Sequence, residues 1–323
     1  MASNYKVALI QLHPKKVKPE LNFQTAAAFI RSAAQQGATL AVLPEYHLTN
    51  WVPDDPLFLH ACSQSNIYLQ RYKALALELK VNIVPGTIVE AHTDAQTKED
   101  KLVNVAYFIS SNGTILGRYE KKNLWHPERP HLTSSTTSPH EVIQTPIGPV
   151  GLLICWDLAF PEAFRELIAA GAKTIIVPTF WTLTDCSPYG LSVNPRAEAL
   201  LLESMVTARA YENTCAVIFV NAGGPAALRD NETDGHSREK GVTGLASKTK
   251  SSNSHYAGLS RVALPFVGAL GDETRNSASE GMSIVDVNMR HVEEAEANYK
   301  VREDIASQSW HYLYRHQGRD VKL

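Results

Sequence analysis

Short apolar runs alternate with amphipathic segments along most of this chain, and this alternation is the feature that most restricts its fold. Tyr5–Leu12 and Ala38–Pro44 are rich in aliphatic residues, as buried strands are, and the second run ends at a proline. Between them, Phe23, Ile30 and Ala33 recur at the spacing of one helical face. Strands that alternate with helices in this way favour an α/β fold.

The same alternation continues to the far end of the chain. Leu69, Tyr72 and Ala76 mark a second amphipathic helix, and Asn112-Gly113 is typical of the turn of a β-hairpin. The further strands expected are Asn82–Glu90, Val103–Ser110, Thr114–Tyr119, Val150–Cys155, Lys173–Val177, Thr214–Val220, Leu259–Leu264 and Gly281–Val287, with helices over Pro161–Ala170 and Ala197–Asn213.

Composition narrows the classes of function open to the 323-residue chain. Hydrophobic residues make up 44% and charged residues 20%, which excludes a disordered or collagen-like protein. The 31 basic and 33 acidic residues give a net charge of −2 without a basic stripe, so no nucleic-acid partner is expected. No uncharged apolar stretch reaches the length of about 18 residues that spans a membrane, so no membrane partner is expected either.

The cysteines and the two chain ends bear on cellular location. Cys62, Cys155, Cys186 and Cys215 are too few for a disulfide scaffold and form no CxxC pair, so we expect free thiols and no metal site. The first residues lead directly into a strand without an apolar leader, and the expected location is therefore cytoplasmic. Val321–Leu323 approaches the Ser-Lys-Leu peroxisomal signal, although valine is a poor first residue.

No shift in composition marks a linker between domains. We expect one domain over residues 1–290 and a C-terminal tail over residues 291–323 that packs on this domain or on a partner subunit. Two polar stretches, His92–Lys101 and Gly223–Tyr256, are predicted to be loops. The longer one is a lid, an interface arm or a solvated loop without function.

Two junctions place a reactive side chain where an apolar strand ends, which is where open α/β sheets build their sites. Glu45 follows an apolar run directly, and partial desolvation there raises a carboxyl pKa toward the range of a general base. Lys121 and Lys122 follow a hairpin strand, and one of them pointing inward would stabilise an oxyanion. The ordinary alternatives are a capping glutamate and a solvated strand end.

A third junction carries Cys155, which lies between an apolar strand and the start of a predicted helix. Backbone N–H groups at such a turn bind an oxyanion, and their field lowers the pKa of a thiol. The alternative is a buried core cysteine, a common fate of a free thiol. Together, Cys155, Glu45 and a lysine would supply a nucleophile, a proton carrier and a fixed cation.

The three junctions lie in motifs that follow one another in a specific order. They are Leu43-Pro44-Glu45, Tyr119-Glu120-Lys121, Cys155-Trp156-Asp157, Phe160-Pro161-Glu162 and the run Ala208–Asn213. Over residues 5–290 this order resembles the nitrilase superfamily, the carbon–nitrogen hydrolases. The resemblance implies a single-domain, four-layer αββα sandwich, a Glu-Lys-Cys triad and no cofactor.

The resemblance also implies a role for each matching position. Glu45 corresponds to the general base, and Cys155 to the nucleophile. Lys121 matches the lysine that stabilises tetrahedral intermediates, and Glu128 lies where many members have a second glutamate that orients substrate or helps proton transfer. The chain departs from the pattern at Asn123, where histidine is commonest.

The implied chemistry is hydrolysis of a carbon–nitrogen bond through a thioester on the cysteine. The thiolate attacks, Lys121 and the N–H of Trp156 stabilise the anion, and water releases a carboxylic acid. Phe160–Glu162 followed by Arg165 resembles the amidase and carbamoylase branches, whereas true nitrilases more often have Cys-Trp-Glu-Asn at the nucleophile. We therefore favour a small linear amide or carbamoyl substrate over a nitrile.

Two other classes remain open on the same fold. One is a catalytically silent binding protein, which the presence of all three triad residues disfavours. The other is an acyltransferase, in which an amine replaces water, but that branch usually carries a membrane domain. Predicted substrate-binding residues are Trp51, His126, Trp156, Phe180, Trp181 and Tyr189, an aromatic wall suited to an apolar acyl group, although Phe180 and Trp181 are equally typical of an interface.

The predicted helix over Ala197–Asn213 has apolar residues on more than one side. Leu200, Leu201 and Met205 cannot all face one core, so a symmetry-related copy is expected to cover the surplus. The resemblance implies pairing through this helix and the helix over Pro161–Ala170. The aromatic residues of Trp310–Tyr314 would extend that contact. We therefore expect a homodimer or a higher homo-oligomer.

Overall fold

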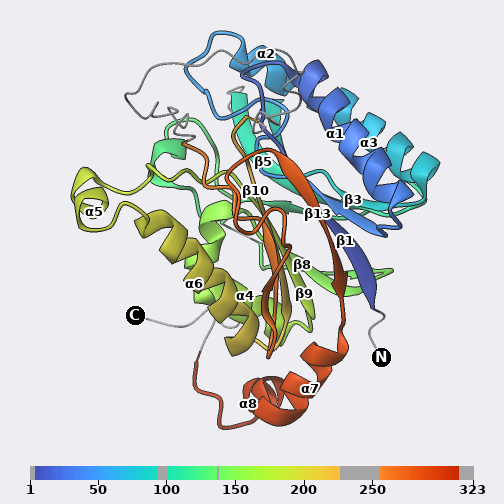
Figure 1. Ribbon diagram of the computed structural model, residues 1–323, viewed down its shortest axis with the longest axis vertical. Coiled ribbons are helices and arrows are strands. Elements are labelled where there is room, and N and C mark those ends of the chain that lie inside the picture. The colour runs from blue at the N-terminus through green and yellow to red at the C-terminus, as the bar shows by residue number, and fades with distance from the viewer. Residues whose placement is uncertain (1–3, 94–99, 137, 226–254, 313–323) are drawn as a thin grey trace, which may run out of the picture.

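The computed structural model describes residues 4–93, 100–136, 138–225 and 255–312, and in it two β-sheets lie face to face (Figure 1). The first sheet has the strand order β13-β1-β2-β3-β5-β4, with β6 added on β5. Its strands are β1 (Tyr5–Gln11), β2 (Leu40–Val42), β3 (Asn82–Val84), β4 (Thr87–Thr93), β5 (Asp100–Ile109), β6 (Ile115–Glu120) and β13 (Gly281–Val287).

The second sheet has the order β12-β11-β10-β9-β8-β7. Its strands are β7 (Val142–Thr145), β8 (Gly148–Leu152), β9 (Thr174–Thr179), β10 (Ala216–Asn221), β11 (Arg261–Leu264) and β12 (Gly268–Leu270). In each sheet three neighbouring strands are parallel, β1-β2-β3 and β8-β9-β10, and the flanking strands are antiparallel.

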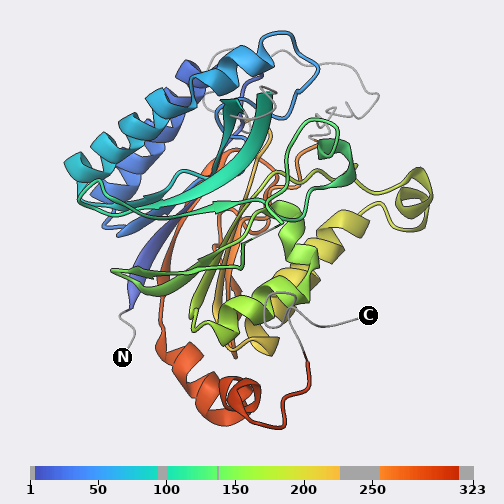
Figure 2. The same ribbon diagram turned by 180° about the vertical axis from the view of Figure 1, so that it is seen from behind.

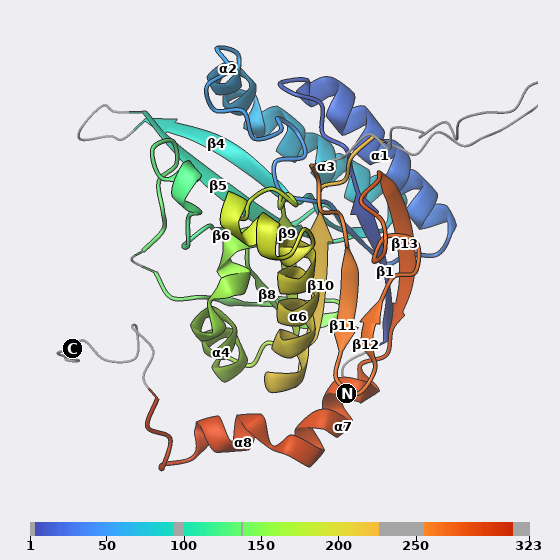
Figure 3. The ribbon, with the colours of Figure 1, turned by 60° about the vertical axis from the view of Figure 1, so that its left-hand side comes forward.

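Helices cover the outer face of both sheets, which makes four layers. The helices α1 (Pro19–Gln35) and α3 (Ser65–Leu79) run side by side along the first sheet (Figures 1 and 2). The helices α4 (Pro161–Ala169) and α6 (Ala197–Glu212) lie on the second sheet (Figure 3). The expected αββα sandwich is therefore confirmed.

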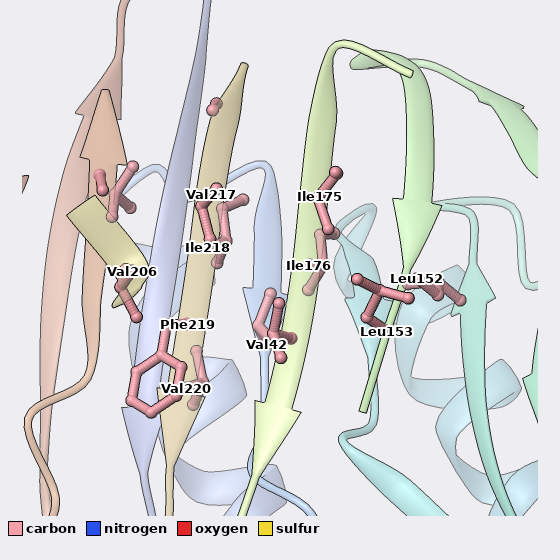
Figure 4. Close-up of a cluster of buried hydrophobic side chains, with 14 of the residues drawn as sticks. Val42, Leu152, Leu153, Ile175, Ile176, Val206, Val217, Ile218, Phe219 and Val220 are labelled. Atoms are coloured by element: carbon pink, nitrogen blue, oxygen red, sulfur yellow. The ribbon is translucent and has the colours of Figure 1, made fainter. Parts of the chain in front are cut away.

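Apolar side chains on both faces of the first sheet explain this layering. Along β1, Val7 and Leu9 face the core between the sheets, whereas Ala8 and Ile10 face the core under α1 and α3. All four side chains are fully buried. Figure 4 shows Val42 of β2 among the side chains of the second sheet. Because successive strand residues point to opposite faces, a continuous apolar run specifies a strand that is covered on both sides.

The strand expected over Asn82–Glu90 is wrong as a single element. It is divided into β3 and β4 because β5 lies between them in the sheet, so the chain must cross from one side of β5 to the other. Pro85 and Gly86 make this crossing, and Gly86 has a φ of +58°. A Cβ at Gly86 would lie 1.8 Å from the carbonyl oxygen of Pro44, so only glycine fits beside the segment that leads into Glu45.

Other boundaries also differ from the expectation. The strand expected to end at Cys155 ends at Leu152, and Cys155 instead begins a 3-10 helix, η2 (Cys155–Ala159). Most of the polar stretch Gly223–Tyr256, together with Tyr314 and Val321–Leu323, lies outside the described residues. The elements that were not anticipated are β7, β12, η1 (His126–Glu128), α2 (Phe58–Ser63), α5 (Pro188–Val193), α7 (Arg290–Tyr299) and α8 (Val301–Ala306).

The helices α7 and α8 lie at the end of the molecule opposite α2 (Figure 1). The first of them buries Val292 and Ala295. On α8, Arg302 donates a hydrogen bond of 2.8 Å to the carbonyl oxygen of Ala172. The division of the chain at residue 290 stays a prediction. Within the described ranges, none of the helices has the combination of length and apolar character that crossing a membrane requires.

Candidate active site

Residues from two strand ends and one 3-10 helix meet in one buried cluster. Glu45 follows β2, Lys121 follows β6, and Glu128 ends η1. The Nζ atom of Lys121 lies 2.8 Å from Oε1 of Glu45 and 2.7 Å from Oε1 of Glu128. All three residues are buried, and Cys155 is 7% exposed. Cys155 lines the same pocket as Glu128 and interacts electrostatically with Glu45 and Lys121, so the structure brings together the four predicted catalytic positions.

The carboxylate of Glu45 is held from both sheets. Its Oε1 accepts a hydrogen bond of 2.8 Å from Nδ2 of Asn104 on β5, and its Oε2 accepts one of 2.9 Å from the backbone N–H of Phe180 after β9. The carbonyl oxygen of Asn104 also accepts the backbone N–H of Lys121 at 2.9 Å. One strand residue thus sets the position of both members of the ion pair.

The backbone at Cys155 is strained, and hydrogen bonds to Asp157 hold it in this conformation. Its φ of +47° lies in the left-handed region, which costs a residue with a Cβ about 1–2 kcal/mol. The buried carboxylate of Asp157 fixes this turn, because it accepts hydrogen bonds from the N–H of Ile154 at 2.9 Å and from the hydroxyl of Tyr119 at 2.8 Å. Asn123, the departure from the family pattern, donates to the same carboxylate through its side chain at 2.8 Å.

Glu128 is fixed as firmly as Glu45. Besides Lys121, the hydroxyl of Tyr46 donates to its Oε1, and the backbone N–H of Trp125 donates to Oε2 at 2.7 Å. The two carboxylates therefore hold the ammonium of Lys121 between them. A cation placed in this way can neither leave the site nor rotate away from it, which is the preorganisation that oxyanion stabilisation requires.

Burial and charge shift the pKa values in the cluster. The pKa of Glu45 is raised to about 7 overall, chiefly by burial, with the charge of Lys121 lowering it and the charge of Glu128 raising it. Burial and the charge of Glu45 also raise the pKa of the Cys155 thiol well above its ordinary value. Burial alone would lower the pKa of Lys121, but Glu45, Cys155 and Glu128 outweigh it and raise the pKa. In the resting site the lysine is therefore charged and the thiol is protonated.

A pocket of about 250 Å³ opens onto this cluster. Trp51, Trp156, Phe180 and Trp181 line it as predicted, whereas His126 and Tyr189 are not among its lining residues. Tyr189 lies on α5 with 78% of its surface exposed, and the ring of His126 lies against Trp125. The full lining is Tyr46, Trp51, Trp125, Pro127, Glu128, Cys155, Trp156, Phe180, Trp181, Thr182 and Asp185.

The sequence analysis missed Tyr46, Asn104, Trp125 and Asp185 as parts of the site. Asn104 left a signal, because it interrupts the apolar strand β5 with a polar side chain that is 1% exposed. Tyr46 and Trp125 each adjoin a residue or motif that was singled out, but their inward direction is set by η1 and by the turn after β2. Within the described ranges, no group of three histidine, cysteine or acidic residues is arranged to hold a metal ion.

A buried thiol, carboxylate and lysine between two sheets define a hydrolase-like architecture, and comparison with known proteins identifies the family. A family model described as carbon-nitrogen hydrolase matches residues 6–297, and the chain belongs to this family. The resemblance to the nitrilase superfamily is thus confirmed.

Individual members of the family share about a third of their residues with this chain over the matched region. The chain is 32% identical over 209 residues to deaminated glutathione amidase from Bos taurus, which covers 62% of this chain and 59% of the relative. It is 31% identical over 179 residues to a nitrilase from Pyrococcus abyssi, covering 54% of this chain and 64% of the relative. The chain thus spans less than two thirds of the length of these curated relatives.

Among solved structures, an amidase from Nesterenkonia sp. is similar over 93% of this chain and 96% of its own, with a TM-score of 0.65 and 20% identity. A further structure of the amidase from Nesterenkonia sp. AN1 shows the result of Michael addition of acrylamide at the active site cysteine. At this level of identity the likeness establishes the fold alone.

Proposed function

We propose that this protein hydrolyses the carbon–nitrogen bond of a small linear amide through a thioester on Cys155. The observation that carries the proposal is the cluster of Cys155, Glu45 and Lys121 at the base of a pocket with apolar walls. The amidase names among relatives and structural neighbours support an amide in preference to a nitrile.

In the proposed reaction, Glu45 takes the proton of the Cys155 thiol as the sulfur attacks the amide carbon. The oxyanion that forms is stabilised by Lys121 and by the backbone N–H of Trp156 at the start of η2. Glu45 then gives its proton to the leaving nitrogen, and ammonia departs as the thioester forms. A water molecule, deprotonated by Glu45, attacks the thioester and releases the carboxylic acid and the thiol.

The pKa shifts favour this sequence of steps. A carboxylate with an ordinary pKa would be too weak a base to take a proton from a buried thiol. The pKa of Glu45 at about 7, which already includes the opposing charge of Lys121, makes the carboxylate a stronger base and leaves about half of it ionised at pH 7. We assign Glu128 the role of holding Lys121 and the substrate, since it both pairs with the lysine and lines the pocket.

The proposal is tested by measuring ammonia release from short aliphatic amides and from nitriles of the same length. The expected result is that the amides are hydrolysed with kcat/KM at least tenfold higher than the nitriles. Preferred turnover of the nitriles would replace the amidase assignment by a nitrilase assignment. If the folded protein released ammonia from neither series, the proposed function would be wrong.

We also propose that two copies pair through α6. Leu200 and Leu201 are 57% and 39% exposed on this helix, while Leu202 and Val206 on its other side are buried in the core. The helix thus presents apolar surface beyond what its own core covers, as a two-fold interface does. Light scattering is expected to show at least a dimer, and a double substitution of Leu200 and Leu201 by glutamate should yield monomers. A wild-type protein that is monomeric at micromolar concentration would contradict the proposal.

A further inference from the structure

The charged side chains that line the pocket are all acidic among the described residues. They are Glu128 and Asp185, and no lysine, arginine or histidine is among the described lining residues. Lys121 is buried and outside this lining, and it is paired with Glu45 and Glu128. The described lining therefore offers no positive charge to a ligand that carries a carboxylate, whereas it offers negative charge to a cationic ligand.

The two acids are not equivalent. Glu128 is already engaged by Lys121, Tyr46 and the N–H of Trp125. Asp185 is half-buried and forms no ion pair within the described ranges. Among the described residues, its two oxygens accept hydrogen bonds from its own turn alone, at 2.9 Å from the N–H and 2.7 Å from the hydroxyl of Thr182. Each carboxylate oxygen has a second acceptor site, so Asp185 retains the capacity to bind a donor from a ligand.

The indole rings beside Asp185 are suited to the same kind of ligand. The ring centroids of Trp125 and Trp156 are 4.3 Å apart, and those of Trp156 and Trp181 are 5.5 Å apart, so these rings form a continuous wall. Tryptophan faces attract ammonium and guanidinium groups more strongly than the other aromatic rings do. The wall therefore provides a surface for a cation as well as for the apolar part of a substrate.

A second carboxylate stands behind this wall. The Nε1–H of Trp181 donates to Oε2 of Glu198 at 2.5 Å, and Glu198 is only 8% exposed. A carboxylate that accepts from an indole N–H pushes electron density into the ring, which strengthens its attraction for a cation. Asp185 and Glu198 also interact electrostatically. Burial is the main cause of the raised pKa of Glu198, and the charge of Asp185 raises this pKa as well. Burial raises the pKa of Asp185 itself, whereas the hydrogen bonds from Thr182 and the charge of the exposed His126 lower it.

We propose that the amide substrate carries a cationic group, a primary ammonium or a guanidinium, at the end remote from the amide, and that Asp185 binds it against the tryptophan wall. This inference rests on the proposed function, because it concerns the acyl part of the amide that Cys155 attacks. Asp185 would then be the residue that determines specificity, while the buried cluster of Glu45, Lys121 and Cys155 would act on the amide itself.

The test uses three amides of matched length. They are 6-aminohexanamide, which is an ammonium ion at neutral pH, heptanamide, in which a methyl group replaces the amine, and pimelamic acid, in which a carboxylate replaces it. We expect kcat/KM for 6-aminohexanamide to exceed that for heptanamide by about tenfold or more, and pimelamic acid to be the poorest substrate. Asp185→Asn should bring the ratio of the first two substrates close to one, whereas Asp185→Glu, which keeps the charge, should retain most of the preference.

The outcomes separate this inference from the function on which it rests. If the wild-type protein hydrolyses heptanamide as well as 6-aminohexanamide, the inference is wrong and the amidase function stands. The inference is also overturned if Asp185→Asn lowers kcat/KM equally for all three amides, because that result would assign Asp185 to the structure of its turn. If the folded protein releases ammonia from none of the three, both the inference and the proposed function fail.

Discussion

Replacing Cys155 by alanine is expected to lower kcat/KM for amide hydrolysis by about 10⁴-fold or more, because the thioester needs a thiol and Cys155 carries the only one among the described residues that line the pocket. The fold should survive the change. Alanine also has a Cβ, so it meets the same backbone strain at a φ of +47° as cysteine does, and the bracing hydrogen bonds of Asp157 do not involve the sulfur. Ammonia release measures the rate, and circular dichroism with thermal unfolding measures the fold.

The matched control is Cys215→Ala, which removes another buried thiol, located just before β10 and outside the described lining of the pocket. This variant should lose some stability and keep its activity. If the folded Cys155→Ala protein retained turnover within tenfold of the wild type, Cys155 could not be the nucleophile. The proposed mechanism would then have to be abandoned.

Replacing Glu45 by glutamine is expected to reduce kcat/KM by about 10²–10⁴-fold, the usual contribution of a general base. Glutamine keeps the shape of the side chain and an oxygen that accepts from Asn104 and Lys121, but it cannot take the thiol proton. Because deacylation also needs this base, mass spectrometry should detect an acyl adduct on Cys155 in any variant that still acylates. An adduct on Cys62, Cys186 or Cys215 instead would contradict the assignment.

The same residue predicts the pH dependence of the wild-type enzyme. Only the ionised form of Glu45 accepts a proton, and its pKa is raised to about 7. The ionised fraction, and with it kcat/KM, should therefore fall about tenfold per pH unit as the pH drops below 7. This acid limb should be absent from the residual activity of Glu45→Gln and unchanged in Glu162→Gln, which alters an exposed carboxylate at the start of α4. An acid limb near pH 4.5 in the wild type would show that Glu45 is not the base.

Several features of this protein follow from the sequence without a structure. The alternating apolar runs specify strands that are buried on both faces, and β1 shows why, since its even and odd residues enter two different cores. The choice of Lys121 over Lys122, in contrast, rests on the resemblance to the nitrilase superfamily, because the residues alone leave both lysines open. Tyr119 and Lys121 lie two residues apart and are both buried, whereas Lys122 is on the other face and only half-buried.

Other features depend on contacts that no local pattern records. Pro85-Gly86 divides an apolar run in two only because β5 lies between β3 and β4 in the sheet. The partners of Glu45 are Asn104 on β5 and the N–H of Phe180 in the second sheet, which are 59 and 135 residues away in the chain. Neither partner can be chosen from the sequence, because the choice depends on which strands pair and on how the sheets stack.

Of the features described, the lining of the pocket is the one that the sequence predicts least. Apolar periodicity indicates which residues are buried, and it therefore located the strand ends that carry Glu45, Lys121 and Cys155. Apolar periodicity carries no information about the direction of a loop. The predicted pocket residues therefore included the exposed Tyr189 and omitted Asp185. The path of a loop is set by hydrogen bonds such as those from Thr182 to Asp185, and by the rings against which it packs. Such contacts are chosen only once the two sheets have come together, and for that reason tertiary structure alone decided the shape and charge of the pocket.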